Sequence, residues 1–288
     1  MKNLLSYISR QAFIIPGGYY LYKLFSYIFP PPKKSEIKII ETPYKFKIKV
    51  DISRYLGNKI YWRGAHDWNT IFALQKTLSP DSILFDIGAN IGEYTLFAAS
   101  MINDNGHVYS FEPVQKMYEQ LQENISLNPH LKNKITPIKK GVGLRKEILP
   151  IYDDINTTND GLFSLHQKNF IDAKIIEEIG IDSLDNIFNI LNINTVHYIK
   201  IDVEGNELFV LQGGINTIKK FKPTLMIEIS EKNFNAAGYS SKDLLSLLKE
   251  LDYSIYLIQK RGKLKPINND SDLPTFCNIL AMSKKYNN

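Results

Sequence analysis

Hydrophobic and polar residues follow two different patterns along this chain, and the pattern changes near residue 68. Before that point, Tyr44–Val50 alternates with a period of two, which predicts a half-buried strand, and Ile60–Trp62 is a candidate partner for it. After that point, short apolar runs alternate with longer amphipathic segments, so strands should alternate with helices. This order predicts right-handed crossovers and a mostly parallel, doubly wound α/β sheet with helices on both faces.

The elements expected in this second part have definite boundaries. The expected strands are Ser82–Asp86, His107–Glu112, Ile135–Lys140, Val196–Asp202, Thr224–Ile229, Ser254–Gln259 and Phe276–Met282. The expected helices are Trp68–Leu78, Gly92–Met101, Val114–Leu127, Ile181–Asn192, Asn206–Thr217 and Ser241–Leu251. No helical pattern separates the last two strands, so one of them should be antiparallel. Residues 152–180 lack clear periodicity, and a long irregular insertion is often functional, which favours a substrate lid.

Residues 1–34 form a predicted appendage to a domain spanning 35–288, whose core sheet begins near residue 80. Helices are expected from Lys2 to Phe13 and from Tyr19 to Phe29. One interpretation packs these helices on the main domain or on a partner subunit. The other places them in the headgroup region at the inner face of a membrane. Because no apolar stretch of about 20 residues runs uninterrupted, no transmembrane helix is expected, and no cleavage site indicates a signal peptide.

Composition narrows the class of protein. With 44% hydrophobic residues, the 288-residue chain can bury a full core. Its net charge of +5 is far from that of a dedicated nucleic-acid binder, so we expect no nucleic-acid partner. Cys277 is the single cysteine, which excludes an internal disulfide and a multi-cysteine zinc site. These properties predict a cytoplasmic protein and leave its oligomeric state open.

The segment Phe85–Gly92 predicts a strand, a tight turn and a helix start, the place where doubly wound sheets bind ligands. Gly88 lets the backbone approach a ligand closely, and free N–H groups at a helix start can bind an anion. The spacing from Gly88 to Gly92 lacks the third glycine that serves a pyrophosphate. A ligand with an amino-acid end fits better. Asp86 can receive its ammonium, directly or through water, and the helix start can receive its carboxylate.

The second strand of the core ends in an acid, Glu112, about 20 residues beyond Gly92, where ribose hydroxyls are usually gripped. A carboxylate can accept hydrogen bonds from both vicinal hydroxyls. The alternative is that Glu112 only favours the following helix, with Pro113 at its first position. Combined with Asp86 and the glycine turn, Glu112 favours a nucleoside cofactor.

Several segments together resemble the FkbM family of methyltransferases. They are Phe85–Thr95, Phe111–Pro113, Ile199–Glu207, Leu211–Gly214 and Pro223–Glu228. The likeness covers roughly residues 60–285, and its lysine–aspartate–glutamate–glycine part is the most specific. It implies the class I methyltransferase fold, a Rossmann-like seven-stranded sheet with its last strand antiparallel. It also implies S-adenosyl-L-methionine as cofactor and O-methylation of sugar or natural-product hydroxyls.

A cofactor site follows from this resemblance and from the turn. Its expected members are Asp86, Gly88, Ala89, Asn90, Gly92, Glu112, Pro113, Gly141, Val142 and Asp202. Gly141 and Val142 depart from the family pattern, because many relatives have Ala followed by another apolar residue there. The departure should not remove the packing on the adenine.

Three residues around the fourth strand are the expected catalytic group: Lys200, Asp202 and Glu204. In the inferred sheet order this strand lies beside the first, so both acids should face the sulfonium end of the cofactor. There they add negative potential and can accept the proton of the attacking hydroxyl, with Asp202 nearest the methyl group. The alternative is that they cap the next helix. Buried Lys200 needs a partner, and Glu228 is expected, either as a structural ion pair or to orient a substrate hydroxyl.

His66 and Asp67 lie just upstream of the first core helix, where a segment can fold over a cofactor site. They are candidates for substrate contact, and a turn or cap role is the competing interpretation. No spacing of His, Asp and Glu predicts a metal site, so none is expected. A cation near Asp202 and Glu204 is left open as an alternative that no pattern supports.

The sequence thus predicts an S-adenosylmethionine-dependent O-methyltransferase acting on a hydroxyl, with a sugar of a surface glycan or glycolipid as the acceptor that the family favours. Other small molecules or lipids are alternative acceptors. A non-catalytic binding module is the competing class, and the presence of Asp86, Gly88, Glu112 and Asp202 disfavours it. A dinucleotide oxidoreductase is disfavoured by the missing third glycine.

Overall fold

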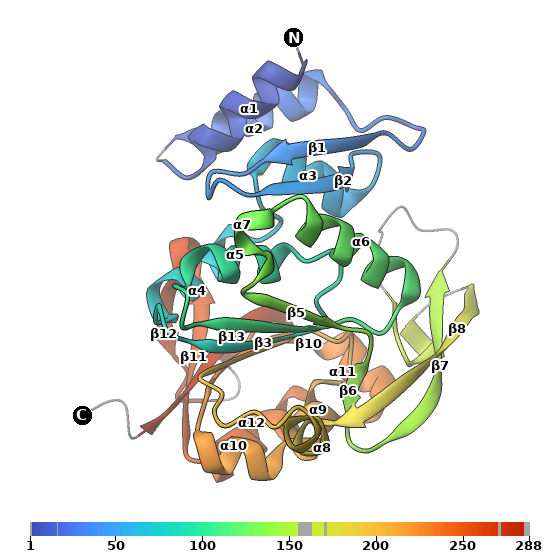
Figure 1. The fold of residues 1–288 in the computed structure, drawn as a ribbon, viewed down its shortest axis with the longest axis vertical. Helices are drawn as coiled ribbons and strands as arrows, with labels where there is room; N and C mark the ends of the chain where they lie inside the picture. Colours follow the sequence, from blue (N-terminus) through green and yellow to red (C-terminus); the bar gives the residue numbers. More distant parts are fainter. Residues whose placement is uncertain (1, 16, 155–162, 170–171, 270–271, 285–288) are drawn as a thin grey trace.

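The computed structural model of the protein describes residues 2–15, 17–154, 163–169, 172–269 and 272–284 (Figure 1). Its centre is an eight-stranded sheet in the order β12-β11-β13-β10-β9-β3-β4-β5. The strands are β3 Ile83–Ile87, β4 His107–Phe111, β5 Ile135–Ile138, β9 Tyr198–Ile201, β10 Thr224–Ser230, β11 Tyr253–Gln259, β12 Lys263–Pro266 and β13 Phe276–Ser283.

The predicted parallel sheet with one antiparallel strand near its end is confirmed. Strands β3, β4, β5, β9 and β10 pair in parallel. Strand β13 is antiparallel to both of its neighbours, β10 and β11. The difference from the expected seven strands is β12, which extends the edge by pairing with β11. Its short, lysine-rich sequence lacks the apolar run that predicts a buried strand.

Helices cover both faces of the sheet (Figure 1). One face carries α4 Trp68–Thr77, α5 Glu93–Met101, α6 Gln115–Ser126 and α7 Pro129–Lys132. The other carries α8 Leu184–Ile190, α9 Glu207–Gly213, α10 Ile215–Phe221 and α12 Ser241–Glu250, and α11 Glu231–Ala237 follows β10 directly. Because successive strand residues point to opposite faces, Leu84 and Tyr198 join one apolar cluster and Phe85 and Ile199 join another.

A smaller sheet follows β5, and it corrects the sequence prediction for this region. Strands β6 Gly141–Gly143, β7 Glu147–Asp154 and β8 Ala173–Ser183 form it, in the order β6-β8-β7. The expected helix from Ile181 to Asn192 is therefore wrong at its start, and residues 173–180 are not irregular. Pairing with β7 decides this conformation, and β8 is mostly exposed in its first part, so its sequence carries no strong hydrophobic period. Residues 155–162 and 170–171 of the predicted lid lie outside the described residues.

The N-terminal part contains α1 Lys2–Phe13 and α2 Gly18–Ile28, close to the predicted helices, then a hairpin of β1 Ile37–Glu41 and β2 Lys47–Asp51. Residues 60–62 were expected in a strand but lie in helix α3 Tyr55–Arg63, where all three are buried. Three consecutive apolar residues do not distinguish a buried strand from a buried helix. Two short 3-10 helices, η1 Gln167–Asn169 and η2 Lys260–Gly262, complete the described elements.

Buried Arg10 fastens α1 to the rest of the protein. Its Nη1 donates to the carbonyl oxygen of Tyr61 at 2.6 Å, and its Nε donates to that of Glu41 at 3.1 Å. Among the helices that the structure describes, none is both long and apolar enough to cross a membrane.

Candidate active site

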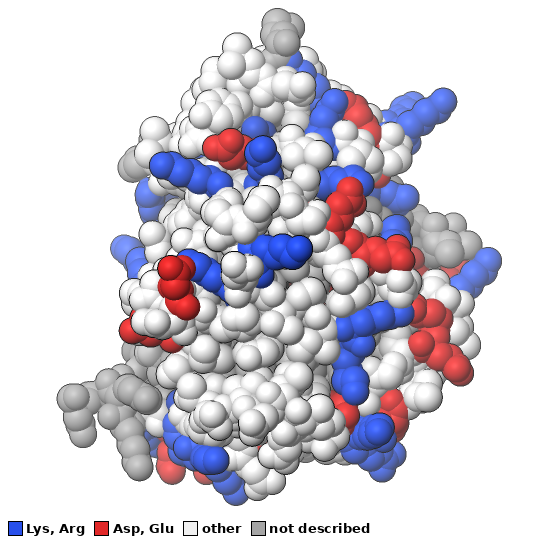
Figure 2. All heavy atoms as spheres, viewed as in Figure 1, with Lys and Arg blue, Asp and Glu red and all other residues white. Residues whose placement is uncertain are grey.

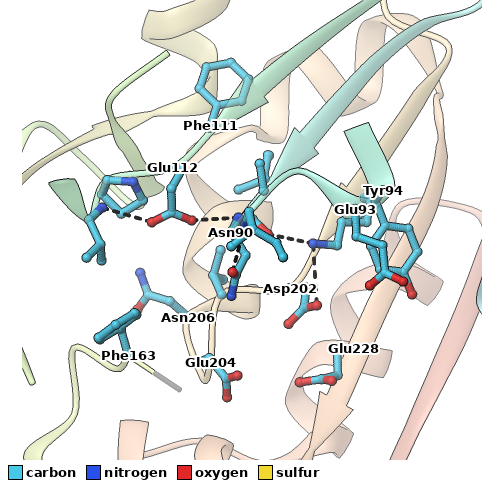
Figure 3. Close-up of a pocket in the computed structure, with 18 of the residues that line it drawn as sticks. Asn90, Glu93, Tyr94, Phe111, Glu112, Phe163, Asp202, Glu204, Asn206 and Glu228 are labelled. Atoms are coloured by element: carbon cyan, nitrogen blue, oxygen red, sulfur yellow. Dashed lines mark hydrogen bonds and ion pairs between the residues drawn. The ribbon is translucent and has the colours of Figure 1, made fainter. Parts of the chain in front are cut away.

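The carboxyl ends of the central strands open into a cavity of about 710 Å³ (Figure 3). The predicted site residues on its wall are Gly88, Ala89, Asn90, Glu112, Pro113, Gly141, Val142, Lys200, Asp202, Glu204, His66, Asp67 and Glu228. Side chains from segments far apart in the sequence therefore meet at one place. Asp86 and Gly92 were also expected there, but neither lines the cavity.

The glycine turn is held against the neighbouring strand β9. Gly88 has a φ of +79°, and a Cβ at this position would lie 1.8 Å from the carbonyl oxygen of Asp202. Only glycine satisfies both conditions without rearrangement. Gly92 has a φ of +90° and turns the chain into α5, and its missing Cβ leaves room for Leu121. Gly92 thus shapes the turn from outside the cavity.

The N–H groups of residues 88–92 all donate within the protein. Gly88 and Ala89 donate to the carbonyl oxygen of Phe111, Asn90 to Glu112, Ile91 to the side chain of Asn90, and Gly92 to Ala89. The turn itself therefore has no open donor. The predicted carboxylate contact rests on the first N–H groups of α5, which begins at Glu93, and stays a prediction.

Glu112 lies between the glycine turn and α6, at the cavity wall (Figure 3). Its carboxylate accepts from the N–H of Asn90 at 2.8 Å and from that of Val114 at 2.9 Å. Burial raises the pKa of Glu112 to about 7, and these two bonds oppose the shift. The bond to Val114 supports the role at the start of α6. Because Glu112 also lines the cavity, its carboxylate is available to a ligand. Its contact with a ribose stays a prediction.

Asp86 lies behind the wall and is fully buried. Its carboxylate accepts from the hydroxyl of Thr95 at 2.6 Å and forms an ion pair with Lys200 at 3.3 Å. Direct contact with a ligand ammonium does not fit this position, and contact through water stays a prediction. Asp86 instead holds Lys200 in place.

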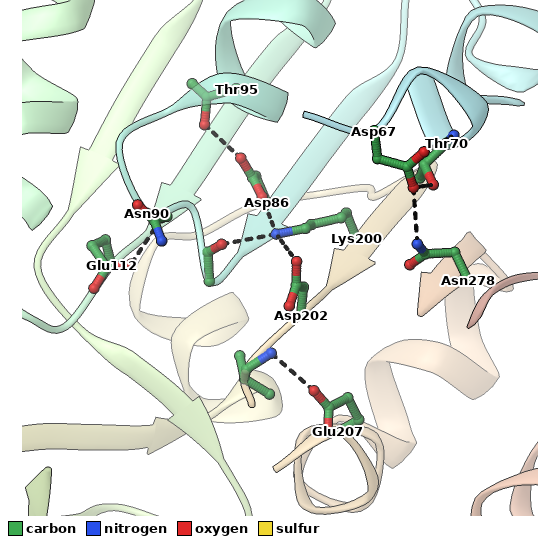
Figure 4. A network of polar contacts seen from close by, with 12 residues as sticks. Asp67, Thr70, Asp86, Asn90, Thr95, Glu112, Lys200, Asp202, Glu207 and Asn278 are labelled. Atoms are coloured by element: carbon green, nitrogen blue, oxygen red, sulfur yellow. Dashed lines mark hydrogen bonds and ion pairs between the residues drawn. The ribbon is translucent and has the colours of Figure 1, made fainter. Parts of the chain in front are cut away.

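Lys200 joins β9 to the first strand and to the turn (Figure 4). Its Nζ donates to the carbonyl oxygen of Gly88 at 2.8 Å and forms ion pairs with Asp86 at 3.3 Å and Asp202 at 3.5 Å. Burial alone would lower the pKa of Lys200, but the carboxylates of Asp202 and Asp86 raise it above its usual value. Lys200 is therefore a charged brace.

The predicted pair between Lys200 and Glu228 is wrong, because the ion pairs of Lys200 are with Asp86 and Asp202. The strand register explains the difference. Lys200 lies directly opposite Asp86 on β3, whereas on β10 it lies opposite Met226, two residues before Glu228. The inferred neighbours of β9 were correct, but the register favours the carboxylate on the other side.

Three carboxylates converge beside this brace. Oxygen atoms of Asp202, Glu204 and Glu228 all lie within 4.8 Å of one another (Figure 3). Burial and the neighbouring Asp202 raise the pKa of Glu204 to about 8 and that of Glu228 well above its usual value. Groups so arranged can share a proton or bind a cation. The expectation of a site without metal is not tested by this geometry.

The capping alternative for Asp202 and Glu204 is not supported in the part of the chain that the structure describes. Their side-chain donors are Lys200 and Asn233, and neither belongs to α9. Glu207 holds the loop before α9 instead, accepting from the N–H groups of Val203 at 2.9 Å and Gly205 at 3.1 Å. No role was predicted for Glu207, although it lies in Ile199–Glu207, the most specific segment of the family resemblance.

The turn between α3 and α4 contributes His66 and Asp67. Asp67 caps α4 by accepting from the N–H of Asn69 at 2.9 Å, and it also binds Asn278 of β13 at 3.1 Å. The cap role is thus confirmed for Asp67. The N–H of His66 donates to buried Glu93 at 2.5 Å, and burial lowers the pKa of His66 to about 4. His66 is therefore neutral near pH 7.

Several wall residues were missed by the sequence analysis. They are Lys59, Arg63, Glu93, Lys140, Asn206 and Asn233. Lys59 and Arg63 lie four residues apart, a helical spacing that was hidden because this segment was expected to form a strand. Glu93 directly follows the glycine turn, and this adjacency was the sequence feature that could have indicated it as a wall residue.

The strand order and this site define a class I methyltransferase fold. A solved FkbM methyltransferase from Methylobacillus flagellatus KT has this fold, with a TM-score of 0.50 and 20% identity; the match covers 75% of this chain and 48% of that one. The chain thus spans about half the length of that structure.

The chain belongs to the FkbM methyltransferase family, because the family described as "Methyltransferase FkbM domain" matches residues 86–255. The hexuronic acid methyltransferase AglP of Haloferax volcanii is 26% identical over 210 residues, which are 73% of this chain and 75% of that protein. The protein is a methyltransferase, and the class I methyltransferase fold of this family uses S-adenosyl-L-methionine as its cofactor.

The residues present fit this cofactor. Gly88, the Glu112 carboxylate and Asp202 line one cavity, as a site for the two ends of this cofactor requires. Gly141 and Val142 of β6 lie on the same wall, as the resemblance implied for the adenine contact.

Proposed function

We propose that the protein methylates a hydroxyl group of a sugar in a surface glycan or glycolipid. The observation that carries this proposal is the convergence of Asp202, Glu204 and Glu228 beside the glycine turn. When bound, S-adenosylmethionine supplies the methyl group on a positively charged sulfur. The protein then has to place an acceptor oxygen in line with that methyl group and remove its proton.

The acidic cluster suits both tasks. Asp202 lies within reach of Lys200 and of the cavity, so its carboxylate has a fixed orientation toward an acceptor hydroxyl. Glu204 and Glu228 have raised pKa values, and carboxylates of this kind take up a proton near neutral pH. We assign the proton transfer to Asp202 first and to Glu204 second, with Glu228 as an acceptor-hydroxyl partner.

The relative AglP supports a sugar, and in particular an acidic sugar, as the acceptor. A uronic acid offers two kinds of oxygen for methylation, a hydroxyl and a carboxylate. Burial and the neighbouring acids at the reaction centre already raise the pKa values of Glu204 and Glu228, so a further carboxylate there is disfavoured. We therefore place a hydroxyl at the reaction centre. Lipids and other small molecules are the alternative acceptors.

The test is incubation with S-adenosylmethionine labelled in its methyl group, together with cell-envelope glycan extracts. We expect label in the glycan fraction and resistance of that label to mild alkali, since a methyl ether survives alkali whereas a methyl ester releases methanol. Alkali-labile label would contradict the hydroxyl assignment. If label appeared only in lipids or small molecules, the acceptor would belong to one of those classes and not to the glycans. Absence of both label and cofactor binding by calorimetry would favour the non-catalytic module.

We further propose that the protein rests on an anionic membrane surface through α1 and α2. One face of this helical pair packs on the domain, which the first interpretation of the sequence expected. The other face is apolar and exposed. Its large side chains include Leu4, Tyr7, Ile8, Tyr20, Leu24, Tyr27 and Ile28. The fully buried residues of α1 are polar, namely Ser6, Ser9 and Arg10. Leu5 and Phe13 pack against the core, whereas the apolar side chains of Leu4, Tyr7 and Ile8 are exposed.

Charge supports a membrane over a second protein as the partner of this face. The first 34 residues contain five basic and no acidic side chains, whereas the whole chain has a net charge of only +5. Residues 35–288 are therefore balanced, and the entire excess lies in the appendage. Figure 2 shows much of this end of the molecule as uncharged surface, with Lys and Arg and some Asp and Glu near it. Basic residues around an apolar helix face are typical of helices that bind anionic lipid.

Replacing Leu24 and Tyr27 by Asp should remove binding to vesicles that contain phosphatidylglycerol. Tyr27 is 87% exposed, so the change leaves the core intact. Flotation of the full chain with anionic and with neutral vesicles measures the effect. Ile175→Asp is the matched control, because Ile175 is 60% exposed on β8, away from the appendage. Equal binding to neutral vesicles, or a dimer in solution that the double variant abolishes, would overturn the proposal.

A further inference from the structure

One end of the cavity has a cluster of nitrogen-bearing side chains that the proposed reaction does not use. Lys59 and Arg63 lie on one face of α3, and His66 follows in the next turn. All three line the cavity. Asp202 of the proposed reaction centre lines the same cavity.

The cations of this group have no carboxylate partner within the part of the protein that the structure describes. The ion pairs between described residues do not include Lys59 or Arg63. The Nζ of Lys59 donates to the hydroxyl of Tyr55. The guanidinium of Arg63 lies over the rings of Phe13 at 4.8 Å and Tyr22 at 5.6 Å.

Aromatic rings position a guanidinium but do not accept all of its hydrogen bonds. The Nε of Arg63 is buried and has no acceptor among the described residues. A buried, unsatisfied donor on a charged group is costly, and a ligand that supplies an acceptor removes that cost. The guanidinium fork matches a carboxylate in geometry, and neutral His66 adds a further hydrogen-bonding group.

The glycine turn itself offers no partner for a carboxylate. The cofactor has a carboxylate, but the N–H groups of residues 88–92 are already used within the protein. A carboxylate in the cavity therefore finds no donor in the turn, whereas Lys59, Arg63 and His66 present nitrogen-bearing groups on the same wall. We infer that Lys59, Arg63 and His66 form a carboxylate-binding subsite. The carboxylate comes from the methionine end of the cofactor or from an acidic sugar, and the second source rests on the proposed function.

Binding measurements on the full chain test this inference with two variants, Lys59→Gln and Arg63→Gln. Affinity is measured for S-adenosylmethionine and for its decarboxylated form, and separately for glucuronate and glucose. Wild type should prefer the carboxylate-bearing member of one pair by about ten- to a hundredfold, the usual effect of a charge-assisted hydrogen bond. Both variants should lose that preference. The first pair assigns the carboxylate to the cofactor, the second to the acceptor.

Arg145→Gln is the matched control, because Arg145 is exposed outside the cavity. Arg63 packs on Phe13 and Tyr22, so Arg63→Gln could also loosen α1 and α2. Lys59→Gln tests the same subsite without that effect. The inference is overturned if wild type shows neither preference, or if both variants retain it. These readouts need no turnover. A protein that methylates a neutral glycan while the variants bind like wild type would refute the subsite and leave the proposed function intact.

Discussion

Substitution of Asp202 by Asn should reduce turnover by about 10²- to 10⁴-fold, the range for loss of a general base. The change removes the charge that faces Lys200 at 3.5 Å and the group that we assign to the acceptor proton. Asn has nearly the same shape, so the loop against Gly88 should survive. The dissociation constant for S-adenosylmethionine should therefore change much less than the turnover. Calorimetry and single-turnover assays with the labelled acceptor separate the two effects.

A matched control for this substitution is Asp104→Asn. Asp104 also pairs with a lysine, Lys134 at 3.2 Å, but its side chain is 98% exposed. Exposed ion pairs contribute little, so turnover and stability should match wild type. Full activity of Asp202→Asn on the true acceptor would show that the reaction centre lies elsewhere in the cavity.

Gly88→Ala should abolish cofactor binding at concentrations that saturate wild type. The new Cβ would lie 1.8 Å from the carbonyl oxygen of Asp202, and the φ of +79° is unfavourable for alanine. The turn and the loop after β9 must then move apart, which displaces the wall that faces the cofactor. A strained backbone of this kind costs about 1–3 kcal/mol before the clash is counted, so the thermal midpoint should fall as well.

Gly180→Ala provides the comparison for that variant. A Cβ on Gly180 meets nothing within 4 Å, and the residue is exposed on β8. It should bind the cofactor and unfold like wild type. If Gly88→Ala bound S-adenosylmethionine normally, the glycine turn would not be the part of the wall that faces the cofactor.

Much of the fold follows from local patterns in the sequence. The apolar runs that became β3, β4 and β9 are buried on both faces, and such runs are readily recognised as parallel strands. The glycine spacing and the acid after β4 were also sufficient to indicate a nucleoside cofactor without a pyrophosphate. Helix α3 was missed because three adjacent buried residues carry no period of their own.

The arrangement inside the site depends on register, which the sequence does not supply. Lys200 could be assigned to a strand, but its choice of Asp86 over Glu228 depends on which residues lie directly opposite one another. The position of Asp86 behind the wall has the same origin. Lys59 and Arg63 were missed with their helix, and the small sheet was missed because cross-strand pairing, not hydrophobic period, specifies β7 and β8.

The brace formed by Lys200 has a consequence for how the protein folds. It joins the Gly88 turn to a residue 112 positions further along the chain. Contacts of such long sequence separation carry a large loop-closure cost and favour slow folding. A growing chain that has not yet reached β9 holds the glycine turn without the cation that neutralises Asp86. The cofactor cradle can therefore be completed only after more than two thirds of the protein has been synthesised, however early the first strands pair.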